Sequence, residues 1–160
     1  MRNTLMILVG FALTLSGLAQ ASSQQERNKK IARSFFEDVL SQGHLEKYAE
    51  SHAKDFVAHG DSRDYTLAED GAAAQEERHA VPDLRMTVNR MVAEKDLVVV
   101  YWTASGTNTQ AGMGLPATGK KIKTSGMTLF RFKAGKISEE WSVWDQVSVL
   151  KQVGLLPAQP

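Results

Sequence analysis

The sequence predicts one α+β domain, with helices in its first half and an antiparallel sheet in its second. Up to residue 80 the apolar residues recur with helical spacing, whereas four segments after Pro82 are rich in β-branched and aromatic residues. The 160 residues are 42% hydrophobic and 23% charged, with four Pro and no Cys, which excludes disordered, collagen-like and disulfide-stapled chains. A chain of this size can bury a sufficient core without disulfides.

The first 21 residues have the pattern of a secretory signal peptide. Arg2 precedes the uncharged stretch Leu5–Leu18 and the small-x-small triplet Ala19-Gln20-Ala21. The apolar run covers about 14 residues, whereas a spanning helix needs roughly 18 to 20, so a retained membrane anchor is the less favoured alternative. We therefore expect cleavage after Ala21, a domain spanning 22–160, no stable membrane anchor after cleavage, and a secreted or periplasmic location.

Three helices are predicted in the first half of the chain. The segment Arg27–Gln42 has apolar residues at every fourth position in two adjacent ladders. Leu45–His52 has i, i+3, i+4, i+7 spacing, which predicts a short second helix. After the polar connection Gly60–Thr66, the Ala- and Glu-rich segment Leu67–Ala80 predicts a third helix, which must end before Pro82.

The second half predicts a meandering sheet and a short last helix. Asp145 can cap that helix and Gly154 can close it. Turn residues separate the four predicted antiparallel strands, which are Leu84–Met91, Leu97–Gly106, Lys120–Phe132 and Lys136–Trp144.

Charge and residue types exclude several functions. Nineteen Lys and Arg against 18 Asp and Glu give a net charge of +1, and the basic residues are dispersed, which argues against nucleic acid as a partner. Without Cys there is no thiol, iron-sulfur or Cys-based zinc chemistry. The four His residues have no zinc-site spacing on a recognisable helix, so no metal site is predicted.

Alternation along the strands divides the sheet into two faces, neither of which is strongly charged. One face mixes aromatic with small and polar side chains, as a pocket wall does. It carries Trp102, Ala104, Gly106, Asn108, Thr124, Gly126, Thr128, Phe130, Glu140, Ser142 and Trp144. The other face is apolar and, since helices can cover only one face, predicts a homodimer. It carries Val99, Tyr101, Thr103, Met127, Leu129, Trp141 and Val143.

Several short motifs follow one another along the chain, from the Phe35-Phe36 pair with Val39-Leu40 and Gly43, through Asp55-Phe56-Val57 with His59, to Gln152-Val153-Gly154. The ordered set resembles the SnoaL-like family of polyketide cyclases and ester cyclases, within the nuclear transport factor 2-like superfamily. The resemblance covers residues 28–157. It implies a cone-shaped, curved antiparallel sheet around a deep pocket that the N-terminal helices close, and a dimer made through the sheet backs. The motifs are Phe35-Phe36 with Val39-Leu40 and Gly43, Asp55-Phe56-Val57 with His59, Pro82-Asp83-Leu84, Val98-Val99-Val100 with Trp102, Gly112–Lys120, Gly135-Lys136-Ile137 with Glu140-Trp141, Trp144-Asp145, and Gln152-Val153-Gly154.

The resemblance also implies an intramolecular aldol closure without metal or other cofactor, driven by an aspartate that acts as general acid and base. Alignment on Gln152-Val153-Gly154 places that aspartate at Ser142, the assisting histidine at Thr128 and a loop histidine at Asn108. All three residues keep hydrogen bonding but do not titrate near neutrality, which suits a binding protein better than an acid-base enzyme.

Two other residues are candidates for proton transfer. His59 follows the Phe56-Val57 patch, at a family position often near the pocket mouth, and histidine titrates near neutrality; the alternative is a surface-loop histidine. Glu140 shares the pocket face, but it can equally reach solvent.

The substrate-binding residues predicted for the pocket are Trp102, Asn108, Thr128, Ser142 and Trp144. Three hypotheses follow from this pocket. The chain is an exported cofactor-free enzyme of the cyclase or isomerase type acting on a carbonyl compound, or a carrier for a small apolar or aromatic molecule. The third is a structural dimer whose cavity is filled by its own aromatic side chains.

Overall fold

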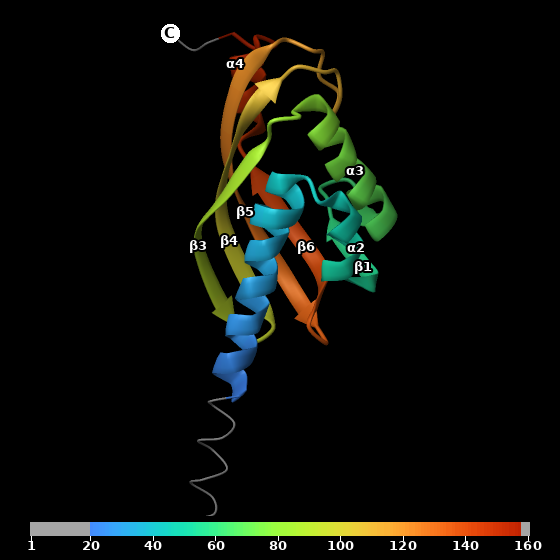
Figure 1. The fold of residues 1–160 in the computed structure, drawn as a ribbon, viewed down its shortest axis with the longest axis vertical. Helices are drawn as coiled ribbons and strands as arrows, with labels where there is room; N and C mark the ends of the chain where they lie inside the picture. Colours follow the sequence, from blue (N-terminus) through green and yellow to red (C-terminus); the bar gives the residue numbers. More distant parts are fainter. Residues whose placement is uncertain (1–19, 158–160) are drawn as a thin grey trace, which may run out of the picture.

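The computed structural model describes residues 20–157, which form one curved six-stranded sheet with helices packed across one of its faces (Figure 1). The strand order is β2-β1-β6-β5-β4-β3. The predicted α+β fold is therefore confirmed, whereas the predicted leader lies almost entirely outside the described residues.

The first helix runs from residue 20 to 42 and begins earlier than its periodicity predicted. Its last part, Phe35–Leu40, is a π-helix (η1) that buries Phe35, Phe36 and Val39. A π-helix has a wider turn than an α-helix and is often found at functional sites. Here it brings two successive phenylalanines against the sheet.

The second predicted helix is shorter than expected and gives way to a strand. Its residues form a 3-10 turn, η2 (Leu45–Lys47), and one α-helical turn, α2 (Tyr48–Ser51). His52 then starts strand β1 (His52–His59), which pairs in parallel with β6. The prediction of a helix through His52 is wrong, because pairing with a strand about 80 residues later overrides the local spacing.

The connection between residues 60 and 66 contains a strand that the sequence did not reveal. Strand β2 (Asp64–Thr66) is three residues long and pairs with β1 at the edge of the sheet. It leads directly into helix α3 (Leu67–Ala80), whose predicted bounds are confirmed. Thr66 and Glu69 form a capping box at its N-terminus.

The four predicted strands are present, and three of them are longer than predicted. They are β3 (Arg85–Glu94), β4 (Leu97–Asn108), β5 (Lys120–Lys133) and β6 (Lys136–Trp144). These four are antiparallel neighbours, and the register places Trp102 opposite Gly126 and Thr128 opposite Ser142.

A glycine in β5 makes room for the indole of Trp102. A Cβ atom built at Gly126 would lie 2.4 Å from Cζ2 of Trp102 and 2.6 Å from the carbonyl oxygen of Val143. Any larger residue would displace the indole or the backbone of β6. Gly126 therefore fixes the position of Trp102 on the concave face of the sheet.

The last helix, α4 (Gln146–Val153), packs on β5 beside the open end of the sheet. Asp145 caps it by accepting a hydrogen bond from the Ser148 backbone N–H at 2.9 Å, and Gly154 ends it with a φ of 83°. Both residues have the structural role that the sequence favoured.

Candidate functional site

A cavity of about 280 Å³ lies between the concave face of the sheet and the helices. Trp102, Thr124, Thr128, Glu140, Ser142 and Trp144 reach it from β4, β5 and β6, and α3 forms the opposite wall. The alternation along the strands thus identified the cavity face correctly. Because this void remains, the protein's own aromatic side chains do not fill the cone, and the third hypothesis is wrong.

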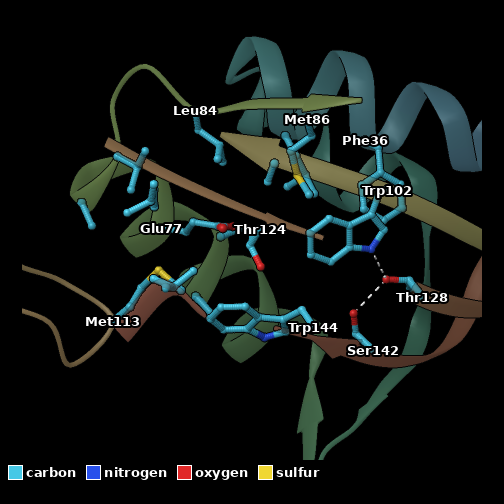
Figure 2. A pocket seen from close by; sticks show the side chains of 18 of the residues that line it. Phe36, Glu77, Leu84, Met86, Trp102, Met113, Thr124, Thr128, Ser142 and Trp144 are labelled. Atoms are coloured by element: carbon cyan, nitrogen blue, oxygen red, sulfur yellow. Dashed lines mark hydrogen bonds between the residues drawn. The ribbon is translucent and has the colours of Figure 1, made fainter. Parts of the chain in front are cut away.

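Three side chains form a hydrogen-bonded series on the sheet wall (Figure 2). The indole Nε1–H of Trp102 donates to Thr128 Oγ1 at 3.0 Å, and Thr128 Oγ1 lies 2.8 Å from Ser142 Oγ. Either hydroxyl can donate between these two atoms, but Thr128 is only 1% exposed and already accepts from Trp102, which favours Thr128 as the donor to Ser142. The Ser142 proton is then free to point into the cavity.

Glu140 lies two residues before Ser142 on β6 and faces the same cavity. Its neighbours on the adjacent strands are the apolar residues Phe130 and Ala58. Its carboxyl group makes no hydrogen bond or salt bridge to any residue between 20 and 157. Burial, with a smaller contribution from the negative charge of Asp70, raises the pKa of Glu140 to about 8. A carboxyl group that titrates near neutrality can both take and return a proton.

Helix α3 brings two further carboxyl groups to the cavity that the sequence did not identify. Burial raises the pKa of Asp70, although the hydroxyl of Tyr48 donates a hydrogen bond to it. Burial also raises the pKa of Glu77, although the charge of Arg78 opposes this change. The pKa of Tyr48 is raised by burial and then by Asp70.

The spacing on α3 contained a signal for these two residues. Asp70, Ala73, Ala74, Glu77 and Ala80 recur at i, i+3, i+4, i+7 and i+10, and all five line the cavity. Because two acids interrupt the inward face, the helix has almost no amphipathic pattern. A helix that is polar on its inner side is the pattern expected where it covers a functional cavity instead of a solid core.

His52 helps to position Tyr48, although it was not predicted to function. Its ring stacks on the Tyr48 ring at a centroid distance of 4.8 Å, and its Nδ1 lies 2.8 Å from the Tyr48 carbonyl oxygen. Burial lowers the pKa of His52 to about 4, so the ring is neutral at neutral pH and Nδ1–H donates to that carbonyl.

Asn108 lines the cavity, but its amide holds a loop. Its Oδ1 accepts hydrogen bonds from the Thr118 backbone N–H at 3.0 Å and from Thr118 Oγ1 at 2.7 Å, and its Nδ2–H donates to the Gln110 carbonyl at 3.0 Å. These bonds fix residues 109–119, whose Met113 and Leu115 reach the cavity. Figure 2 shows Met113 beside Trp144, which is 38% exposed.

His59 does not line the cavity. It ends β1 beside Trp141 and stacks on that indole at a centroid distance of 4.4 Å. Its Nδ1 lies 3.0 Å from an Asp64 oxygen, and its Nε2 lies 3.0 Å from a Glu139 oxygen. Since Trp141 and Glu139 alternate with the cavity residues of β6, His59 belongs to the opposite face, away from the predicted pocket mouth.

Among residues 20–157, no three His, Asp or Glu side chains are grouped so as to hold a metal ion. Of the helices that the structure describes, none has the length and apolar character needed to cross a membrane.

Comparisons with known proteins agree with this architecture. The family profile of the SnoaL-like polyketide cyclases matches residues 30–153. IdmH from Streptomyces antibioticus, a candidate polyketide cyclase, is 27% identical with a TM-score of 0.70, over 79% of this chain and 98% of that chain. A candidate cyclase from Acidithiobacillus ferrooxidans is 28% identical with a TM-score of 0.69, over 79% and 94%.

A third solved structure shares the fold but has a different description. AclR from Streptomyces galilaeus, a candidate hydroxylase, is 24% identical with a TM-score of 0.78, over 85% of this chain and 86% of that chain. No curated protein sequence matches. The family and its cyclase neighbours support a function of the cyclase or isomerase type, and the chain belongs to the SnoaL-like polyketide cyclase family, with the nuclear transport factor 2-like fold.

Proposed function

We propose that the protein is a cofactor-free enzyme of the cyclase or isomerase type, and that Glu140 moves a proton on a carbon next to a carbonyl group. The observation that carries this proposal is the Glu140 carboxyl, which is enclosed by protein, faces the cavity and has a pKa of about 8. General acid-base catalysis works best when the pKa of the catalytic group lies near the working pH.

Ser142 supplies the second group that this reaction needs. The series from Trp102 through Thr128 leaves its hydroxyl proton directed toward the cavity, where it can donate to the carbonyl oxygen of a substrate. Residues 140 and 142 lie about 7 Å apart along the strand, close enough for one small ketone to contact both side chains. Glu140 then removes the proton while Ser142 stabilises the negative charge that develops on oxygen.

The test measures exchange of the α-hydrogens of 2-tetralone, an enolisable aromatic ketone, by NMR in deuterated buffer. We expect the wild-type protein to accelerate exchange, with a rate that rises as pH passes about 8, because the base must be ionised. Glu140→Gln should lower the rate by about 10²- to 10⁴-fold, the usual contribution of a general base.

Glu139→Gln is the matched control, because Glu139 is the adjacent residue and points to the other face of the sheet. It should retain the exchange rate. An unchanged rate in Glu140→Gln, or an equal loss in Glu139→Gln, would remove Glu140 from the reaction.

A carrier for a small apolar or aromatic molecule is the second candidate function. It is favoured by the positions that the family resemblance assigns to catalysis, where this chain has Ser142, Thr128 and Asn108. The Asn108 amide is moreover hydrogen-bonded to the loop through both Oδ1 and Nδ2. If the protein is a carrier, the wild type and Glu140→Gln should bind 2-tetralone equally well. Neither should accelerate the exchange of its α-hydrogens above the rate in buffer alone.

We propose export to the periplasm or the medium on the pattern of residues 1–21. Mass spectrometry of the protein recovered from the producing cells should give an N-terminus at Ser22, whereas an intact N-terminus would contradict export by this route.

A further inference from the structure

The carboxyl groups of the cavity have no positive counterpart in its wall. Asp70 and Glu77 reach the cavity from α3, and Glu140 reaches it from β6. In the range 20–157, no lysine, arginine or histidine lines the same cavity. Three acidic groups therefore share an enclosed, mainly apolar space without a cationic side chain.

The three groups differ in how they are partnered. Asp70 accepts a hydrogen bond from Tyr48, and it lies close enough to Glu140 for its charge to raise the pKa of that residue. Glu77 and Glu140 are half-buried, line the cavity, and make no side-chain hydrogen bond or ion pair within the part of the chain that the structure describes. A carboxyl group that faces a cavity without a protein partner keeps its oxygens available to accept hydrogen bonds from a ligand.

Glu77 occupies a different end of the cavity from the hydroxyl series. It lies near Met113 and Thr124 in Figure 2, whereas Thr128 and Ser142 lie at the other side of the Trp102 indole. Glu77 is two helical turns beyond Asp70, so about 10 Å of the α3 axis separates these residues. The proposed reaction uses Glu140 and Ser142, which leaves Glu77 without a role.

We propose that the substrate is an aromatic or apolar carbonyl compound that carries a basic nitrogen, and that this nitrogen binds as an ammonium ion against Glu77. This inference rests on the proposed function for the carbonyl end of the molecule and adds a cation subsite at the α3 end. The aromatic faces of Trp102 and Trp144 line the same cavity and attract cations. The carboxylate of an acidic substrate would lose its hydration without finding a cationic side chain among the described residues that line this cavity.

The test compares three naphthalene probes that differ only in one substituent: 1-naphthylmethylamine, 1-naphthalenemethanol and 1-naphthoate. Binding is measured by calorimetry with the full chain at neutral pH and physiological salt, so that no turnover is required. We expect the amine to bind at least about tenfold more tightly than the alcohol, and the carboxylate to bind most weakly.

Variants locate the preference within the cavity. Glu77→Gln should bring the affinities for amine and alcohol together, whereas Glu77→Asp should keep part of the difference. Glu139→Gln, which removes an equal charge from the outer face, should leave the difference intact. If Glu77→Gln does not fold, Glu77→Asp still locates the preference, because it keeps the charge but draws it back from the cavity and should reduce the difference.

The proposal is overturned if the alcohol binds as tightly as the amine, if the carboxylate binds best, or if the amine does not bind at millimolar concentration. It is also overturned if Glu139→Gln weakens the preference as much as Glu77→Gln. A confirmed preference without α-hydrogen exchange would remove the proposed function and keep the cation subsite. Exchange without the preference would do the reverse.

Discussion

Glu139 and Glu140 are neighbours of the same residue type, and they show how strand alternation decides what a carboxyl group can do. A hydrogen bond from His59, together with one from Arg131, lowers the pKa of Glu139 on the outer face. Burial raises the pKa of Glu140 on the cavity side to about 8. The first is a surface ion pair, whereas the second is available for proton transfer near neutral pH.

The raised pKa of Glu140 predicts that Glu140→Gln becomes more stable than the wild type as pH increases. The unfolded carboxyl titrates near 4.5 and the folded one near 8, so between these values the folded state binds more protons and the wild type loses stability with rising pH. Gln does not titrate. The difference in the free energy of unfolding between variant and wild type should be small at pH 5 and reach a few kcal/mol by pH 9. It grows by about 1.4 kcal/mol for each pH unit between the two pKa values.

Urea unfolding followed by circular dichroism across this pH range measures the difference. Glu139→Gln should show no such gain. The partners of Glu139 lower its pKa in the folded protein, so the ionised side chain stabilises the fold above the pKa that it has in the unfolded chain, and the variant loses this contribution. A constant difference between Glu140→Gln and wild type from pH 5 to pH 9 would show that Glu140 is ionised in the folded protein at neutral pH.

Sequence reasoning located the sheet side of the site but not its helix side. Trp102, Thr128 and Ser142 were predicted because an exact period of two assigns each strand residue to a face. Glu77 was missed because the spacing that it shares with Asp70 and three alanines mixes acids with small residues, which does not identify the face that meets the sheet until the fold is known. His59 was placed wrongly, since its face depends on the register of β1 against β6.

At the level of elements, the segments with strong local signals were predicted well. Helix α3 lies between the capping box that begins at Thr66 and the proline at position 82. Helix α4 lies between the Asp145 cap and Gly154. Strand β1 was missed because its pairing is parallel, contains a register shift and joins segments far apart in the chain. Non-local hydrogen bonds of this kind leave no periodic trace in the sequence.

The loop of residues 109–119 contributes Met113 and Leu115 to the wall of the cavity. Asn108 fixes its two ends, and the backbone N–H of Met113 donates to Glu76 Oε1 of α3 at 2.8 Å. Met113 and Gly114 have φ values of 56° and 73°, which turn the chain back at this point. One hydrogen bond to α3 thus holds the tip of the loop near the cavity mouth.

Glu76→Ala should release this tip without affecting the core. We expect 1-naphthylmethylamine to dissociate about three- to tenfold faster, since an exposed hydrogen bond contributes roughly 0.5 to 1.5 kcal/mol. Stopped-flow measurement of tryptophan fluorescence provides the rate. Gln75→Ala on the same helix is the control, because Gln75 is exposed and does not contact the loop through a hydrogen bond within residues 20–157. Equal dissociation rates in both variants would mean that the loop does not gate the cavity.

For the whole molecule, the two faces of the sheet have different surroundings. The helices cover the concave face, whereas the other face keeps Tyr101, Met127 and Val143 at 37%, 52% and 70% exposure (Figure 1). Leu129 and Trp141 lie on the same face and are half-buried. Contiguous apolar surface of this kind is typical of protein interfaces.

We propose that this face, formed by Tyr101, Met127, Leu129, Trp141 and Val143, joins two copies of the chain. A stable interface of about 800 Å² on each partner should give a dimer at tens of micromolar protein. Val143→Asp would place a charge without a partner within the contact and should give a monomer by size-exclusion chromatography with light scattering. Val147→Asp, at 53% exposure on α4, makes the same substitution away from this face and should remain dimeric.

The interface and the cavity are formed by alternate residues of the same two strands. Met127 and Thr128 are consecutive on β5, as are Trp141 and Ser142 on β6. A dimer contact on the outer face would therefore stabilise the two strands that position the Thr128 and Ser142 hydroxyls on the cavity face. Val143→Asp should therefore lower the affinity for the naphthalene probes even though residue 143 does not line the cavity. A wild-type monomer at tens of micromolar would contradict the interface, and a monomeric Val143→Asp with unchanged affinity would show that each cavity functions alone.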